Sequence, residues 1–125
     1  MARKVLVVDD ESSICELIKL ALSGKGFDVI TASTGEEGVK LVKESSPDLV
    51  LLDMTMPDIS GTEAARKMKE TEPGKNVPII IMSGRGTTES ELDRSLFAGI
   101  LNKPFSIADL IKTANTYTSK TSVVR

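Results

Sequence analysis

The chain alternates short apolar runs with segments in which apolar residues recur every three or four positions. The run at residues 49–52 contains no polar residue, which is typical of a strand buried on both faces of a sheet. Comparable runs, bounded by glycine, proline, serine or charged residues, precede and follow it. The predicted strands cover residues 5–8, 27–32, 49–52, 77–82 and 99–102.

Helical spacing of apolar residues predicts a helix after each of these strands. Ser12 or Ser13 is the expected N-terminal cap of the first helix, which stops before Gly24, and Ser106 is the expected cap of the last. The other predicted helices cover residues 35–44, 62–70 and 87–96. The side chains expected to face the core include Ile14, Leu17, Ile18, Ala21, Leu22, Ala64, Ala65, Met68, Ile107, Leu110, Ile111 and Ala114.

Strands that alternate with helices favour an α/β fold, in which a parallel sheet carries helices on both faces. The length of 125 residues suits a single domain, and we expect residues 1–125 to form one. Residues 116–125 are polar, so we expect this tail to fray or to serve as a linker.

Composition excludes several classes of function. The 18 acidic and 16 basic residues give a net charge of -2, which offers no support for nucleic-acid binding. The chain has no histidine, so Ser-His-Asp and Cys-His catalysis and the usual catalytic zinc sites are excluded. Cys15 is the only cysteine, and its apolar neighbours favour a small core residue over a reactive thiol.

The apolar runs are too short to span a membrane or to form the core of a signal peptide. We therefore expect a cytoplasmic protein without membrane partners.

Polar residues suited to chemistry follow four of the five predicted strands. They are Asp9 and Asp10 after the first, Asp53 after the third, Ser83 after the fourth and Lys103 after the fifth. In a doubly wound sheet these strand ends share one edge, where ligands bind. Clustered carboxylates repel one another unless a cation lies among them, and Mg²⁺ suits oxygen ligands. A metal ion, a lysine and a hydroxyl donor together suit phosphoryl transfer to a carboxylate.

These strand-end sequences resemble those of the receiver domain of two-component response regulators, the family of chemotaxis-regulator-like proteins. The matching segments are residues 5–11, Asp53-Met54-Thr55-Met56-Pro57 with Gly61, Ser83-Gly84 and Lys103-Pro104-Phe105. The resemblance extends over roughly residues 4–117 and implies a flavodoxin-like sheet with the strand order 2-1-3-4-5.

The resemblance also implies a role for each residue of the site. Asp53 would accept a phosphoryl group from a histidine kinase or a histidine phosphotransfer protein. Asp10 and Asp53 would bind Mg²⁺ through their carboxylates, Thr55 through its backbone carbonyl and Asp9 through a water molecule. Ser83 would hydrogen-bond the phosphoryl group and Lys103 would pair with it. Phosphorylation would then change contacts with an output protein whose identity the sequence does not give.

Some features differ from the family pattern. Ile100 occupies the position where the family usually has an aromatic switch residue, and the segment between Ser83 and Lys103 is shorter than usual. Thr55 and Arg85 occupy positions that often tune phosphate lifetime in the family. The resemblance further predicts a cis peptide bond between Lys103 and Pro104.

Three alternative functions would use parts of the same pattern. An aspartyl-phosphate phosphohydrolase usually has a second acid two residues after its nucleophile, where this chain has Thr55. A flavodoxin-like nucleotide-binding protein would need a loop rich in glycine and hydroxyl residues after the first strand, where this chain has acids. A degenerate receiver that acts only as a scaffold would be expected to lack part of the acidic site.

Overall fold

Five parallel strands form a single sheet in the order β2-β1-β3-β4-β5, as predicted. The structure is a computed structural model that describes residues 2–84 and 86–118. Its strands are β1 (Lys4–Val8), β2 (Asp28–Ala32), β3 (Leu49–Asp53), β4 (Ile79–Ser83) and β5 (Gly99–Asn102). Its α-helices are α1 (Ser12–Ser23), α2 (Gly35–Ser45), α3 (Gly61–Lys69) and α4 (Ile107–Thr118), with short 3₁₀ turns at Pro73–Lys75 and Glu89–Glu91.

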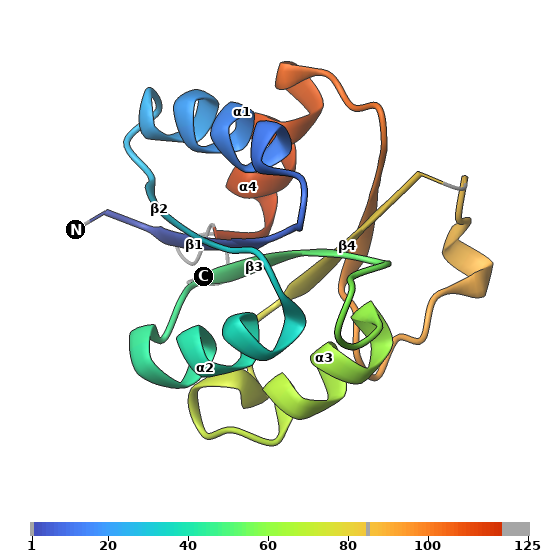
Figure 1. The fold of residues 1–125 in the computed structure, drawn as a ribbon. Helices are drawn as coiled ribbons and strands as arrows, with labels where there is room; N and C mark the ends of the chain where they lie inside the picture. Colours follow the sequence, from blue (N-terminus) through green and yellow to red (C-terminus); the bar gives the residue numbers. More distant parts are fainter. Residues whose placement is uncertain (1, 85, 119–125) are drawn as a thin grey trace, which may run out of the picture.

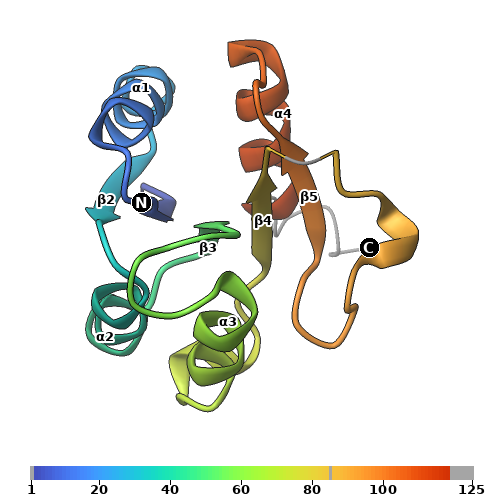
Figure 2. The same cartoon turned by 45° about the vertical axis from the view of Figure 1, so that its right-hand side comes forward.

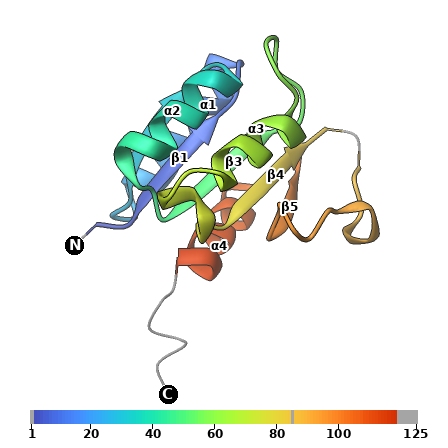
Figure 3. The same cartoon turned by 90° about the horizontal axis from the view of Figure 1, so that it is seen from below.

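Helices α1 and α4 cover one face of the sheet, and α2 and α3 cover the other (Figure 1). The view from below in Figure 3 shows α2 and α3 lying across the near face while α4 lies beyond the sheet. Because successive side chains of a strand point to opposite faces, each inner strand contributes side chains to two hydrophobic clusters, one on each face of the sheet. In β3, Val50 and Leu52 join the cluster under α2 and α3, whereas Leu49 and Leu51 join the cluster under α1 and α4. Every residue of β3 and β4 is buried, as predicted for residues 49–52 and 79–82, but β4 begins at Ile79, two residues later than predicted.

The strand order reverses between β1 and β3, because β2 lies on one side of β1 and β3 on the other. Such a switch point leaves a crevice outside the carboxyl ends of the two strands, and ligands of open α/β sheets bind there. Asp9 directly follows β1 and Asp53 ends β3, so the fold brings both carboxylates to this crevice.

The predicted cap of α1 is wrong. Ser12 and Ser13 lie inside the helix, and its N-cap residue is Glu11, which makes no capping hydrogen bond through its side chain. The carboxylate of Asp9 instead accepts from the backbone N–H of Glu11 at 2.9 Å, so a residue of the acidic cluster organises the start of α1.

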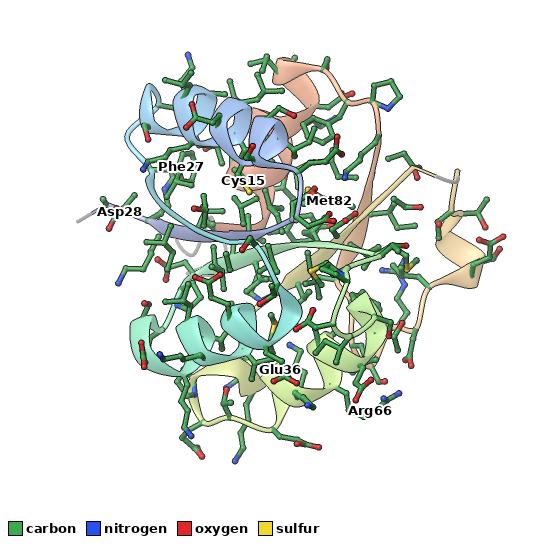
Figure 4. The ribbon with its side chains drawn as sticks, in the orientation of Figure 1. Cys15, Phe27, Asp28, Glu36, Arg66 and Met82 are labelled. Carbon is green, nitrogen blue, oxygen red and sulfur yellow. The ribbon has the colours of Figure 1, made fainter. Side chains whose placement is uncertain are left out.

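Two side chains predicted to face the core are substantially exposed. Leu17 of α1 is 41% exposed and Ile107 of α4 is 42% exposed. In α1 the buried stripe is Cys15, Ile18 and Leu22, which are spaced by three and four residues and leave Leu17 on the flank. Figure 4 shows Cys15 and Phe27 in the layer between α1 and the sheet, which confirms that Cys15 is a core residue.

The helix predicted at residues 87–96 is also wrong. Only one 3₁₀ turn, Glu89–Glu91, forms in this segment, which leaves the end of β4 and returns to the start of β5 without further regular structure (Figure 2). This single turn is closed by two hydrogen bonds: Thr88 N–H donates to the Glu91 carboxylate at 3.3 Å, and Glu91 N–H donates to the Thr88 carbonyl at 3.1 Å. It stops because the Asp93 carboxylate accepts from both the backbone N–H and the hydroxyl of Ser95, and this local turn competes with helical hydrogen bonds.

Part of the tail predicted at residues 116–125 is helical instead. Residues 116–118 belong to α4, because Tyr117 donates its hydroxyl to the carbonyl of Ala98 at 3.4 Å and Arg3 donates to the Thr118 hydroxyl at 3.1 Å. Residues 119–125 lie outside the described part of the chain. None of the helices in the part that the structure describes is long and apolar enough to cross a bilayer.

Gly61, the first residue of α3, lies against the backbone that carries Asp53. A β-carbon at this position would lie 2.7 Å from the carbonyl oxygen of Asp53 and 3.0 Å from the α-carbon of Met54. We therefore expect Gly61→Ala to force the end of β3 to move and to lower the free energy of unfolding by about 1–3 kcal/mol, measured by urea denaturation.

Gly24→Ala is the matched control for this substitution. A β-carbon at Gly24 would lie no closer than 3.5 Å to its neighbours, which is ordinary van der Waals contact. Its effect should stay within about 1 kcal/mol. If both alanine variants lose the same stability, the close approach at Gly61 does not constrain β3.

Candidate functional site

Lys103 connects two carboxylates at the carboxyl edge of the sheet. Its Nζ atom lies 2.8 Å from Oδ2 of Asp9 and 3.2 Å from Oδ1 of Asp53. The exposed carboxylate of Glu11 lies further away, at 3.9 Å from the same nitrogen. The sequence predicted that these strand ends meet, and the structure brings Asp9, Asp53 and Lys103 into direct contact although they are far apart in the chain.

The backbone around each of these residues explains their positions. Asp9 N–H donates to the carbonyl of Ala32 at the end of β2, at 3.0 Å, so the Asp9 side chain stays at the edge of the sheet. Lys103 N–H donates to the carbonyl of Ser83 at 2.6 Å, which extends the β4–β5 ladder by one bond. The peptide bond between Lys103 and Pro104 is cis, as predicted.

The site is largely buried. The side chain of Asp9 is fully buried, that of Asp53 is 12% exposed and that of Lys103 is 18% exposed. Burial, followed by the charge of Asp9, raises the pKa of Asp53, and Lys103 only partly offsets this shift. Burial by itself would lower the pKa of Lys103, but its hydrogen bond to Asp9 and the charges of Asp9 and Asp53 raise it overall. The pKa of Asp53 is thus raised mainly by its burial, and the pKa of Lys103 is raised by the two carboxylates that it faces.

Asp10 supplies a third carboxylate from the loop after β1. Its side chain is exposed, and one carboxylate oxygen each from Asp9, Asp10 and Asp53 lie within 4.8 Å of one another. Two oxygens on opposite sides of one Mg²⁺ ion are about 4.2 Å apart, so a small inward movement suffices for this group to share a single ion. The all-oxygen donor set and its negative charge therefore fit a hard divalent cation.

Ser83 ends β4 and is fully buried. Its Oγ atom lies 2.7 Å from Oγ1 of Thr87, in the segment between β4 and β5. Thr87 could not be selected from the sequence, because its segment was predicted to be helical and no spacing rule links the two hydroxyls.

The structure describes two of the three other residues singled out from the sequence, Thr55 and Ile100. Thr55 follows Asp53 by two residues in the loop before α3, and its side chain is exposed. Arg85 lies outside the described residues. Ile100 is half-buried and packs against the cluster under α2 and α3. Cys15 contacts the site through its thiol, which donates to the carbonyl of Asp9 at 3.4 Å, and burial raises its pKa to about 11. This shift supports the structural interpretation of the cysteine.

Asp58 is a further residue that sequence reasoning missed. Its two carboxylate oxygens accept from the backbone N–H groups of Gly35 and Glu36 at 3.0 and 2.9 Å. These hydrogen bonds lower the pKa of Asp58. They tie the loop after β3 to the start of α2, where the N-cap residue Thr34 accepts separately from Glu37 N–H through its hydroxyl. An acid in a turn sequence is too common to have suggested this contact between separate segments.

Comparison with known proteins agrees with this architecture. Residues 5–115 match the response regulator receiver domain family. The chemotaxis protein CheY4 of Vibrio cholerae superposes with a TM-score of 0.87 at 28% sequence identity, covering 94% of this chain and 99% of that one. NtrX from Brucella abortus superposes with a TM-score of 0.85 at 28% identity, covering all of this chain (100%) and 29% of that one.

A third structure is similar in fold at lower identity. The receiver domain of the sensor histidine kinase PA1611 from Pseudomonas aeruginosa superposes with a TM-score of 0.86 at 23% identity, covering 96% of this chain and 100% of that one. That domain holds a magnesium ion in its active site cleft.

The parallel sheet with its acidic edge is thus the architecture of the receiver domains of response regulators, which act in two-component signalling. The chain belongs to the response regulator receiver domain family.

Proposed function

We propose that this protein accepts a phosphoryl group on Asp53 and that the modification switches its contacts with other proteins. The observation that carries the proposal is the contact of Lys103 Nζ with both Asp9 and Asp53 at a buried sheet edge where Asp10 adds a third carboxylate. We further propose that residues 1–125 act as one receiver domain.

The proposed donor is a phosphohistidine on a histidine kinase or a histidine phosphotransfer protein, since this chain contains no histidine. A carboxylate oxygen of Asp53 attacks the phosphorus atom, and a P–O bond forms as the P–N bond breaks. The electron pair of the P–N bond returns to the imidazole, which takes up a proton from solvent. The product is an acyl phosphate on Asp53.

The side chains around Asp53 have separate roles in this proposal. Lys103 provides a positive charge that stays beside the carboxylate while negative charge accumulates on the phosphoryl oxygens. Ser83 supplies a hydroxyl donor to one of those oxygens. Asp9, Asp10, Asp53 and the carbonyl of Thr55 would hold Mg²⁺, which when bound neutralises charge on the transferring group.

The proposal is tested by incubation with acetyl phosphate and Mg²⁺, followed by intact-mass spectrometry. A receiver should accumulate a protein species heavier by one phosphoryl group. A phosphohydrolase would instead release phosphate through many turnovers with other phosphate esters. Release of that kind, without the heavier species, would contradict a switch that modifies itself.

Magnesium should stabilise the folded protein. The three carboxylates repel one another, and an ion that binds only the folded state adds about 2.7 kcal/mol of stability at a hundredfold excess over its dissociation constant. Thermal unfolding with and without millimolar Mg²⁺ measures this effect.

Asp10→Ala should abolish that dependence on Mg²⁺, because it removes the exposed member of the carboxylate group. Without metal, the same variant should melt no lower than the wild type, since a like charge is gone. Equal melting temperatures for the wild type in the two conditions would contradict the metal site.

A further inference from the structure

A second hydroxyl lies within hydrogen-bond distance of the serine that is proposed to bind the phosphoryl group. Ser83 Oγ and Thr87 Oγ1 are 2.7 Å apart, which is the usual distance of a good O–H···O hydrogen bond. Ser83 is fully buried and Thr87 is half-buried, so the bond is partly shielded from water.

The position of Thr87 is determined by its surroundings. Gly86, the residue before Thr87, has a φ angle of 68°, in the left-handed region that glycine adopts readily. The side-chain amide of Asn102 donates to the carbonyl of Thr87 at 3.3 Å. Asn102 in turn pairs with Ser83 in the register of β4 and β5. Thr87 is therefore attached to both strands beside the site even though its segment lacks a regular helix.

The direction of the hydrogen bond between Ser83 and Thr87 decides which hydroxyl proton this bond uses. Each hydroxyl has one proton and can accept two hydrogen bonds, so only one of the pair donates to the other. If Ser83 donates to Thr87, its proton is engaged there. If Thr87 donates, the Ser83 proton is not used in the bond between the two hydroxyls.

We propose that Thr87 is a positioning residue whose hydroxyl donates to Ser83 Oγ, so that Ser83 directs its own proton to a phosphoryl oxygen on Asp53. This inference rests on the proposed function. A hydrogen bond to an anionic oxygen is roughly twice as strong as one between neutral groups, so arrival of the phosphoryl group favours this arrangement. The Thr87 bond also polarises the Ser83 hydroxyl and strengthens its bond to the phosphoryl oxygen.

Thr87→Val tests the proposal, because valine keeps the branched shape of threonine and lacks the hydroxyl. The rate of phosphorylation by acetyl phosphate at saturating Mg²⁺ should fall about threefold to tenfold, the value of one hydrogen bond. Thr87→Ser, which restores a hydroxyl, should return the rate to within about twofold of the wild type. Thr88→Val is the matched control, because the Thr88 hydroxyl is exposed and contacts Ser90.

A double-mutant cycle separates positioning from a structural role. In a Ser83→Ala background, Thr87→Val should cause no further loss of rate, because the hydroxyl through which Thr87 acts is absent. A structural role would slow phosphorylation equally in both backgrounds. Thr87→Ala provides a second variant without a hydroxyl if the valine variant folds poorly.

Two results would overturn the inference. One is a wild-type rate in folded Thr87→Val, and the other is equal slowing with and without the Ser83 hydroxyl. Absence of phosphorylation in the wild type would instead contradict the proposed function itself, so the two failures are distinguishable.

Discussion

Asp53→Asn is expected to reduce phosphorylation by acetyl phosphate and Mg²⁺ to below detection. An amide cannot supply the anionic oxygen that forms an acyl phosphate, so the loss should be complete rather than partial. Asparagine has nearly the same shape as aspartate, and the substitution removes one of several like charges at the site. The variant should therefore fold, and circular dichroism with intact-mass spectrometry checks both points.

Asp58→Asn is the matched control for this experiment. It makes the same chemical change at a different carboxylate. The side chain of Asp58 is exposed and accepts hydrogen bonds from the backbone N–H groups of Gly35 and Glu36. Its phosphorylation should equal that of the wild type. Labelling that persists in Asp53→Asn, or that disappears equally in Asp58→Asn, would argue against Asp53 as the acceptor.

Lys103→Met is expected to destabilise the metal-free protein by about 3 kcal/mol at neutral pH. Lys103 pairs with the fully buried carboxylate of Asp9 and with Asp53, and removal of one partner leaves buried negative charge without compensation. Urea denaturation without Mg²⁺ measures the loss, and added Mg²⁺ should restore part of it by replacing the missing positive charge.

The loss caused by Lys103→Met should depend on pH with a definite sign. Lys103 lowers the pKa of Asp53, so without the lysine this pKa rises further above its ordinary value. A carboxyl group with a raised pKa in the folded state binds protons more tightly there than in the unfolded chain. The loss of stability should thus be full at pH values above the pKa of Asp53 in the folded variant. It should shrink as the pH falls through that pKa towards the pKa of Asp53 in the unfolded chain.

Lys67→Met provides the control for a surface ion pair. Lys67 pairs with Glu36 at 2.9 Å, but the two side chains are 39% and 55% exposed. The substitution should change stability little at any pH, because water and salt screen exposed charges. Equal losses of stability in Lys103→Met and Lys67→Met would show that the buried contacts of Lys103 stabilise the fold no more than an exposed ion pair does.

Most of the sheet could be predicted from the sequence, because each inner strand is a continuous apolar run. Residues 49–52 and 77–82 predicted strands that are buried on both faces, and β3 and β4 are. The meeting of Asp9, Asp53 and Lys103 followed as well, since parallel strands place all their carboxyl ends at one edge. The residue roles at that edge remain predictions until phosphorylation is measured.

The segment between β4 and β5 could not be predicted in this way. Thr88 and Glu91 close a single turn, and the Asp93–Ser95 turn ends it, so two local preferences compete over a few residues. Thr87 was missed for the same reason, because its contact with Ser83 depends on the path of an irregular chain. The cap of α1 was missed because Asp9, outside the helix, accepts from Glu11 N–H.

The position of the phosphoryl group is the most direct test of the proposed switch. After phosphorylation with acetyl phosphate, sodium borohydride reduces an acyl phosphate to an alcohol, which converts the modified aspartate to homoserine. Tandem mass spectrometry of the digested protein then locates the changed residue. The proposal predicts homoserine at position 53 alone, and reduction at Asp9 or Asp10 instead, or at no aspartate, would contradict it.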